Sequence, residues 1–103
     1  MSFLQRLFGS SQKAGLAEII SQGAFLVDVR SAQEFACGHV KGSVNIPLQI
    51  LPSQLSKFKN KKNIIVFCLS GMRSGQAKKI LEQNGFTNVI NGGTWTQVNQ
   101  FVS

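Results

Sequence analysis

The residue types best suited to chemistry lie together in one short segment, Cys68-Leu69-Ser70-Gly71-Met72-Arg73. Gly71 can adopt a positive φ, so this segment can curl and direct several backbone amides toward its own centre. Amides arranged in this way, beside a helix N-terminus and an arginine, form a binding site for an anion. A cysteine at the rim of such a site has a lowered pKa, because these groups stabilise the thiolate. The segment therefore predicts a nucleophilic Cys68, with Leu69 to Arg73 forming the substrate-binding loop.

This loop must be positioned by a strand before it and a helix after it. Residues 63–67 include the apolar run Ile64-Ile65-Val66-Phe67. A run without polar alternation is typical of a strand covered on both faces. Residues 74–84 carry apolar side chains at helical spacing, with lysines on the opposite face. The pattern places Cys68 at the carboxyl end of a buried strand, where parallel α/β sheets bind their ligands.

The rest of the chain alternates strands and helices in the same way. Ser31 and Glu34 form a capping box, which predicts a short helix from Ser31 to near Gly38. Further helices are expected over residues 13–22 and 52–58, and further strands over residues 24–29, 43–46 and 87–90. This alternation predicts a mostly parallel sheet with helices on both faces.

The length of the chain, 103 residues, is that of a single domain. Residues 13–103 are interpreted as this domain and residues 1–12 as an N-terminal extension, in which residues 1–9 are expected to form one amphipathic turn. No apolar run is long enough for a signal peptide or a membrane span. The two cysteines, Cys37 and Cys68, are too sparse for a disulfide framework, so we expect a protein of the reducing cytoplasm.

The chain is strongly basic, with a formal net charge of +7 and a pI of about 10.0. Such a balance favours anionic small molecules, acidic protein surfaces or nucleic acid as partners. Four lysines are close together in the sequence: Lys57, Lys59, Lys61 and Lys62. No aromatic residues alternate with them as in a nucleic-acid platform, so no nucleic acid is expected. A plain solvated surface and an acidic protein partner are the two remaining interpretations.

The order and spacing of several motifs resemble the rhodanese-like family. The motifs are Val27-Asp28-Val29-Arg30, Glu34-Phe35, Gly38-His39-Val40, Gly42-Ser43, Asn45-Ile46-Pro47, the Cys-x-x-Gly-x-Arg loop from Cys68 to Arg73, and Gly92-Gly93. They cover about residues 13–95 of the chain. The resemblance implies a five-stranded parallel sheet flanked by helices on both faces, and it implies the activity of a sulfurtransferase.

The resemblance also implies roles for the loop residues. Cys68 would take sulfane sulfur from thiosulfate or a persulfide and pass it, as a Cys68 persulfide, to cyanide, a thiol or a protein cysteine. The amides of Leu69 to Arg73 would hold the transferred sulfur, and no metal or other cofactor is needed. Arg73 is expected either to attract anionic donors or to pair with a nearby carboxylate, and both roles are compatible. Ser70 and Ser74 are interpreted mainly as structural support for the loop and the following helix.

Four further reactive side chains are interpreted as bystanders or as structural residues. Asp28 and Arg30 stand at the end of a strand and are expected to support the fold through hydrogen bonds to loops and to Glu34. Histidine often serves as an acid or base in catalysis, but the motif neighbours of His39 indicate that it braces a loop. Cys37 lies at the end of a short helix and is interpreted as a bystander, with a resolving thiol as the alternative.

Other functions use related features. Cysteine phosphatases and arsenate reductases also build an anion site between a cysteine and an arginine, but with a longer loop than the four residues between Cys68 and Arg73. The shorter loop suits a single sulfur atom, and no aspartate clearly offers itself as the general acid that phosphatases use. The same fold serves as a non-catalytic interaction module, although such modules commonly lose the nucleophile that this chain keeps. A sulfur carrier for a specific protein partner lies between the enzyme and the module.

Overall fold

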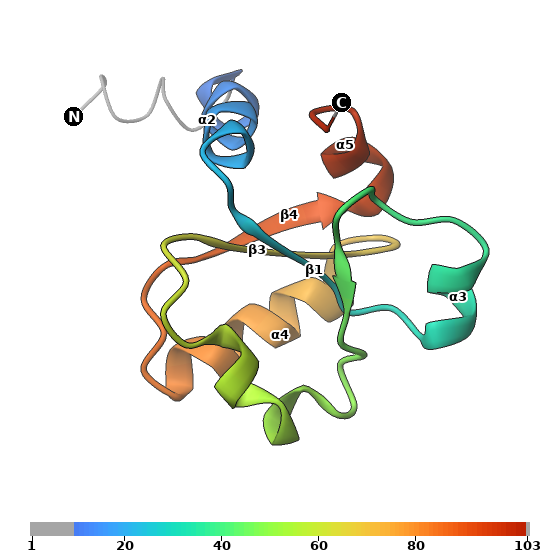
Figure 1. The fold of residues 1–103 in the computed structure, drawn as a ribbon, viewed down its shortest axis with the longest axis vertical. Helices are drawn as coiled ribbons and strands as arrows, with labels where there is room; N and C mark the ends of the chain where they lie inside the picture. The colour runs from blue at the N-terminus through green and yellow to red at the C-terminus, as the bar shows by residue number, and fades with distance from the viewer. Residues whose placement is uncertain (1–9, 103) are drawn as a thin grey trace.

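A parallel sheet of four strands forms the centre of the protein. The computed structural model describes residues 10–102. Across the sheet the order of the strands is β2 (Val44–Asn45), β1 (Phe25–Asp28), β3 (Ile64–Cys68) and β4 (Val89–Thr94), as Figure 1 shows. Each neighbouring pair of strands is parallel. This confirms the prediction of a parallel sheet made from the alternation of elements.

The number of strands implied by the family resemblance is wrong for the part of the chain that the structure describes. The sheet there has four strands and not five. The physical reason is that residues 10–102 contain four segments with the apolar pattern of a strand, and the segment before β1 is helical. The elements outside the sheet are α2 (Ser10–Ser21), α3 (Ala32–Ala36), the 3-10 helices η1 (Leu51–Ser53) and η2 (Leu55–Phe58), α4 (Met72–Gln83) and α5 (Trp95–Asn99).

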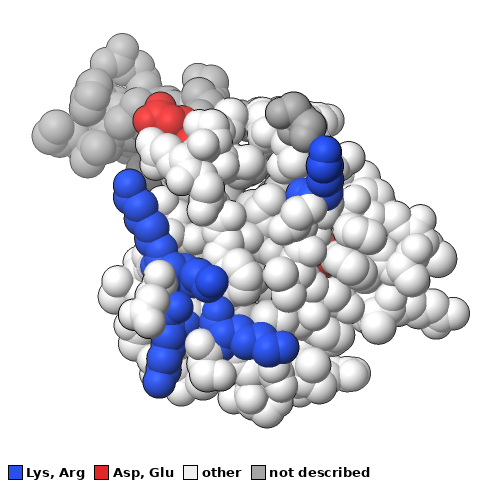
Figure 2. Space-filling model, in the orientation of Figure 1, with Lys and Arg blue, Asp and Glu red and all other residues white. Residues whose placement is uncertain are grey.

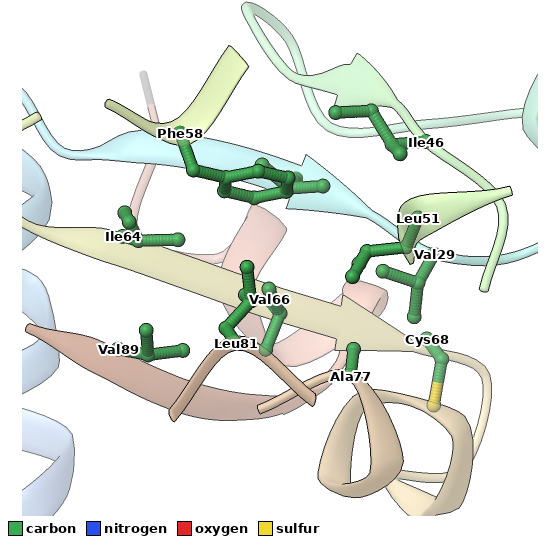
Figure 3. Packing of buried hydrophobic residues seen from close by; sticks show 11 residues of the cluster. Val29, Ile46, Leu51, Phe58, Ile64, Val66, Cys68, Ala77, Leu81 and Val89 are labelled. Carbon is green, nitrogen blue, oxygen red and sulfur yellow. The ribbon is translucent and has the colours of Figure 1, made fainter. Parts of the chain in front are cut away.

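Both faces of the sheet are covered, because the central strand β3 is buried at every position. Side chains alternate between the two faces of a strand. Ile64, Val66 and Cys68 therefore face α4, η1 and η2, where they belong to one buried cluster (Figure 3). Ile65 and Phe67 face the opposite side and belong to a second buried cluster, which includes residues of α2 and α5. The apolar run without alternation thus predicted a strand between two layers correctly.

Several element boundaries differ from the predictions. The helix expected over residues 52–58 is two 3-10 helices, because Gln54 leaves the helical region with a φ of −118° and a ψ of 21°. The helix after the loop begins at Met72 rather than at Ser74, since Gly71 is its N-cap residue. β4 continues to Thr94, and α5 follows it directly, which the sequence pattern did not predict.

Two observations concern the N-terminal part of the chain. α2 begins at Ser10, before the predicted domain boundary at residue 13. The amphipathic turn expected over residues 1–9 lies outside the described residues.

Between residues 10 and 102, none of the helices has the length and apolar character needed to cross a membrane.

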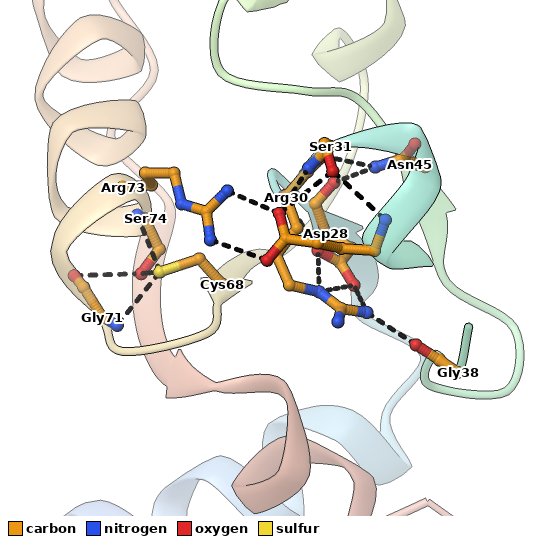
Figure 4. Close-up of polar contacts among 10 residues, drawn as sticks. Asp28, Arg30, Ser31, Gly38, Asn45, Cys68, Gly71, Arg73 and Ser74 are labelled. Carbon is orange, nitrogen blue, oxygen red and sulfur yellow. Dashed lines mark hydrogen bonds and ion pairs between the residues drawn. The ribbon is translucent and has the colours of Figure 1, made fainter. Parts of the chain in front are cut away.

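A buried ion pair closes the carboxyl end of β1. The Nη2 atom of Arg30 is 2.7 Å from the Oδ2 atom of Asp28, and the two side chains are 4% and 0% exposed. The same Nη2 atom donates to the carbonyl oxygen of Gly38 at 2.7 Å (Figure 4). The guanidinium also lies over the Trp95 ring, 4.6 Å from its centroid. Arg30 thus connects the end of β1 to the loop at Gly38, as expected, and Asp28 holds the Arg30 guanidinium. The contact with Glu34 that we predicted for them is replaced by one from Arg73 to Glu34.

We predict that Arg30→Ala lowers the free energy of unfolding by about 3–5 kcal/mol, because it leaves the Asp28 carboxylate buried without its partner. Urea denaturation followed by circular dichroism measures this difference. Lys57→Ala, at an exposed lysine, is the matched control and should change the stability little. If Arg30→Ala lowers the free energy of unfolding no more than Lys57→Ala does, the structural role of the Asp28–Arg30 pair is contradicted.

Candidate active site

Cys68 is the last residue of β3, and only three residues separate it from α4. Its side chain lies on the face of β3 that α4 covers (Figure 3). Gly71 ends the connecting loop as the N-cap residue of α4, with a φ of 98°. This left-handed conformation is strained for residues with a Cβ atom, so the tight turn requires a glycine. The turn brings the N-terminal amides of α4 next to the Cys68 sulfur.

Several hydrogen-bond donors converge on this sulfur. The amide nitrogen of Gly71 is 3.0 Å from Sγ, and the amide nitrogen of Ser74 is 3.4 Å from it. The hydroxyl oxygen of Ser74 also lies 3.4 Å from Sγ (Figure 4). Burial opposes ionisation of the thiol, but hydrogen bonds from the Ser74 hydroxyl and from the amides of Ser74, Gly71 and Ser70 outweigh it. The pKa of the Cys68 thiol is therefore lowered, as the sequence predicted.

The sulfur is nevertheless enclosed. Cys68 has an exposed fraction of 0%, whereas Leu69 and Met72 on either side of the turn are 57% and 75% exposed. Leu69 and Met72 thus present their side chains to solvent, while the Gly71 amide lies against the sulfur. A molecule can react with Cys68 only after the groups around the sulfur move, and the exposed turn of residues 69–71 is the adjoining segment.

Arg73 is held by a carboxylate. Its Nη1 and Nη2 atoms lie 2.7 Å and 3.1 Å from the two carboxylate oxygens of Glu34 (Figure 4). The hydrogen bond from Arg73, together with one from the Ser31 amide, lowers the pKa of Glu34 to about 2. Glu34 is therefore ionised at neutral pH and offsets the charge of Arg73. Of the two roles expected for Arg73, the structure shows the pairing.

A small cavity adjoins the same arginine. Its volume is about 150 Å³, which is several times the volume of one water molecule in the liquid. It is therefore large enough for a small molecule and too small for a folded partner. Its walls are partly apolar, and the lining residues are Val29, Ser31, Pro47, Leu48, Gln49 and Arg73.

His39 and Cys37 are not among the residues that hydrogen-bond the Cys68 sulfur in the described part of the chain. The Nδ1 atom of His39 is 2.9 Å from the carbonyl oxygen of Phe35, and its ring stacks on the Phe35 ring with centroids 3.8 Å apart. These contacts agree with the loop-bracing role predicted for His39. Cys37 is an exposed free thiol, and Cys68 is a buried free thiol.

Two residues near the sulfur were not assigned to the site by the sequence analysis. Ser74 was interpreted as structural support, yet its hydroxyl lies against Cys68. Asn91 was not considered, although it accepts a hydrogen bond from the Ser74 hydroxyl at 2.7 Å. The signal that was available is the position of Asn91 before Gly92-Gly93, near the end of the strand that pairs with β3. Neighbouring parallel strands end at the same edge of a sheet, so polar residues there approach the same site.

Solved structures provide an independent comparison for this geometry. The chain resembles an Escherichia coli rhodanese solved with anions, at 35% identity and a TM-score of 0.66, over 73% of this chain and 91% of that one. It also resembles a human single-domain sulfurtransferase, at 28% identity and a TM-score of 0.71, over 87% of this chain and 94% of the human one.

Sequence relatives agree with the structural ones. The thiosulfate sulfurtransferase PspE of Escherichia coli is 39% identical over 69 residues, which cover 65% of this chain and 66% of PspE. The first three curated relatives are matched over 54% to 66% of their own length. Other relatives have names that describe a sulfurtransferase or a putative sulfur carrier protein. The family model of the rhodanese-like domain matches residues 12–94, and the chain therefore belongs to the rhodanese-like domain family.

Proposed function

We propose that this protein is a sulfurtransferase that carries sulfane sulfur on Cys68. The observation that supports it most directly is the set of donors around the sulfur: the Gly71 amide at 3.0 Å, the Ser74 amide at 3.4 Å and the Ser74 hydroxyl at 3.4 Å. These donors stabilise a negative charge on sulfur. A thiolate is the reactive form of cysteine, and a terminal persulfide sulfur carries the same charge.

The proposed reaction has two displacements. The Cys68 thiolate attacks the sulfane sulfur of thiosulfate or of a small persulfide. The sulfur–sulfur bond of the donor breaks, and sulfite or a thiolate leaves with the bonding electron pair. A thiolate or cyanide then attacks the outer sulfur of the Cys68 persulfide and releases the Cys68 thiolate. Each step exchanges one bond to sulfur for another, so the cycle balances without an external oxidant or reductant.

A sulfur carrier is the second candidate, since a relative bears that name. A carrier would use the same Cys68 persulfide and would differ in delivering it to a specific protein. Figure 2 shows lysine and arginine side chains gathered on the side of η2 and of the loop that leads into β3. Lys57, Lys59, Lys61 and Lys62 are exposed there, and such a surface suits an acidic protein. This surface is at the amino end of β3, so a partner held there would leave the carboxyl end with Cys68 uncovered.

Sulfur loading tests which residue carries the sulfur. Reduced protein incubated with thiosulfate or glutathione persulfide should gain the mass of one sulfur atom, because the stabilised thiolate retains the transferred sulfur. Intact-protein mass spectrometry measures the gain, and peptide mapping locates it. Cys68→Ser should abolish the gain, whereas Cys37→Ser, at the exposed cysteine, should retain it.

Two results would count against this assignment. One is a sulfur adduct that follows Cys37 and persists in Cys68→Ser. The other is complete protection of Cys68 from iodoacetamide in the folded protein, because a sulfur that a small reagent never reaches cannot exchange with a donor. Cys37 labelling in the same sample serves as the internal control for the reagent.

The Arg73–Glu34 pair should determine how Cys68 responds to the charge of a reagent. The ratio to measure is the alkylation rate of Cys68 with anionic iodoacetate divided by its rate with neutral iodoacetamide. We expect Arg73→Ala to lower this ratio about fivefold, the effect of roughly 1 kcal/mol between close charges in water. Glu34→Gln should raise the same ratio, since it frees the charge of Arg73 and a glutamine can still complete the capping box with Ser31. The kcat/KM for thiosulfate should follow the ratio in both variants. Equal ratios in the two variants and the parent protein would assign Arg73 to structural support alone.

A further inference from the structure

The orientation of the Asn91 side-chain amide is fixed by two backbone groups. The amide nitrogen of Gly93 donates to Oδ1 of Asn91 at 2.9 Å. Nδ2 of Asn91 donates to the carbonyl oxygen of Gly71 at 3.3 Å. A backbone N–H must face an oxygen and a backbone carbonyl must face a nitrogen, so exchanging the two amide atoms would break both contacts. Oδ1, which only accepts, is thus the atom turned toward Ser74.

This orientation determines where the Ser74 hydroxyl hydrogen points. Oγ of Ser74 lies 2.7 Å from Oδ1 of Asn91, 3.1 Å from the carbonyl oxygen of Gly71 and 3.4 Å from Sγ of Cys68. A serine hydroxyl has one hydrogen to donate, and Asn91 is its nearest acceptor. When the hydrogen points to Asn91, Ser74 presents a lone pair to Cys68. A lone pair suits a thiol, which donates, but a thiolate requires a donor.

The regular alternation of β4 places Asn91 on the face of the sheet that α4 covers, and a bulge follows it. Val89 lies on the α4 face of the sheet, so Asn91, two residues later, lies on the same face. The register of β4 on β3 then shifts, because Val66 pairs with Asn91 and Phe67 with Gly93. The residue between them is Gly92, where a Cβ atom would come within 2.9 Å of side-chain atoms of both Ile65 and Val98. Bulges of this kind occur beside functional sites, and here the Gly93 amide, just after the bulge, donates to Oδ1 of Asn91.

We propose that Asn91 is a positioning residue that acts on Cys68 by competing with the sulfur for the single hydroxyl hydrogen of Ser74. In the thiol state Cys68 donates to Ser74, and Ser74 donates to Asn91. When the sulfur becomes a thiolate, Ser74 turns its hydrogen from Asn91 to the sulfur. Oδ1 of Asn91 then keeps the Gly93 amide, and water replaces the lost donor because Asn91 is exposed. The same exchange at a Cys68 persulfide rests on the proposed function, but the exchange at the thiol does not.

If Asn91 competes for the Ser74 hydrogen, its removal makes Cys68 ionise more readily, whereas removal of a residue that only supports the loop has the opposite effect. Without Asn91, the Ser74 hydroxyl donates to the thiolate with no competing acceptor of that strength, so Cys68 ionises more readily. Without Ser74, the sulfur loses this donor, so Cys68 ionises less readily. Asn91 acts only through the Ser74 hydroxyl, so its removal has no such effect when residue 74 is alanine. A residue that only braced Gly71 would instead weaken the Gly71 amide contact when removed, and Cys68 would ionise less readily.

The test is the pH profile of Cys68 alkylation by iodoacetamide, measured in a Cys37→Ser background so that one thiol reports. Relative to that parent, Asn91→Ala should shift the midpoint to lower pH by about 0.5–1 unit, and Ser74→Ala should shift it to higher pH by a similar amount, as one hydrogen bond implies. The double variant should match Ser74→Ala. Asn91→Asp keeps the acceptor and adds a negative charge, so its midpoint should not fall below that of the parent. Circular dichroism shows that each variant is folded.

Three outcomes would overturn the proposal: an unchanged or raised midpoint in Asn91→Ala, a lowered midpoint that persists undiminished in the double variant, or a lowered midpoint in Asn91→Asp. If Asn91→Ala does not fold, the Asn91→Asp result decides by itself, and a midpoint at or above that of the parent supports the proposal. Alkylation requires no sulfur donor. Failure of this proposal is therefore distinguished from failure of the sulfurtransferase function, which is read from sulfur loading of the same variants.

Discussion

The hydrogen bond from the Gly71 amide to the Cys68 sulfur, 3.0 Å long, is the contact on which the site depends. It exists because Gly71 adopts a φ of 98° and so reverses the chain within three residues of the end of β3. The same reversal starts α4 beside the sulfur and places Ser74 against it. A residue with a Cβ atom at position 71 would strain this turn and displace the amide of residue 71 from the sulfur.

The site relies on hydrogen bonds at short range more than on net charge. The chain carries a net charge of +7, yet Arg73, the cation of the loop motif, is offset by the carboxylate of Glu34. Burial of Cys68 works against its ionisation, but hydrogen bonds to a charged atom are stronger where water is excluded. Burial of the sulfur therefore strengthens each hydrogen bond from an amide, while the loss of hydration disfavours the thiolate. The lowered pKa of Cys68 is the net result of these opposed effects.

The sequence predicted those features that depend on local patterns. The apolar run of β3 required two covered faces, and Ser31 and Glu34 form the predicted capping box. Predictions failed where the outcome depends on contacts between distant segments or on analogy. The fifth strand came from the family resemblance and not from the residues. Asn91 meets Ser74 because the register of β4 on β3 places Asn91 beside the start of α4, and no local pattern specifies the register of two strands.

The short turn between Cys68 and α4 is the segment that can move most readily to expose the sulfur. Cys68 on one side is anchored by the fully buried β3, and Ala77 and Leu81 on the other side fix α4 in the same core. The turn between them is exposed at Leu69, and exposed segments with few buried contacts open at the lowest free-energy cost. Ser74 is buried within α4, so it stays beside the sulfur when the turn opens and the Gly71 amide moves away. Ser74 is then the donor that remains with the reacting sulfur, which is why the residue that orients its hydroxyl matters to the chemistry.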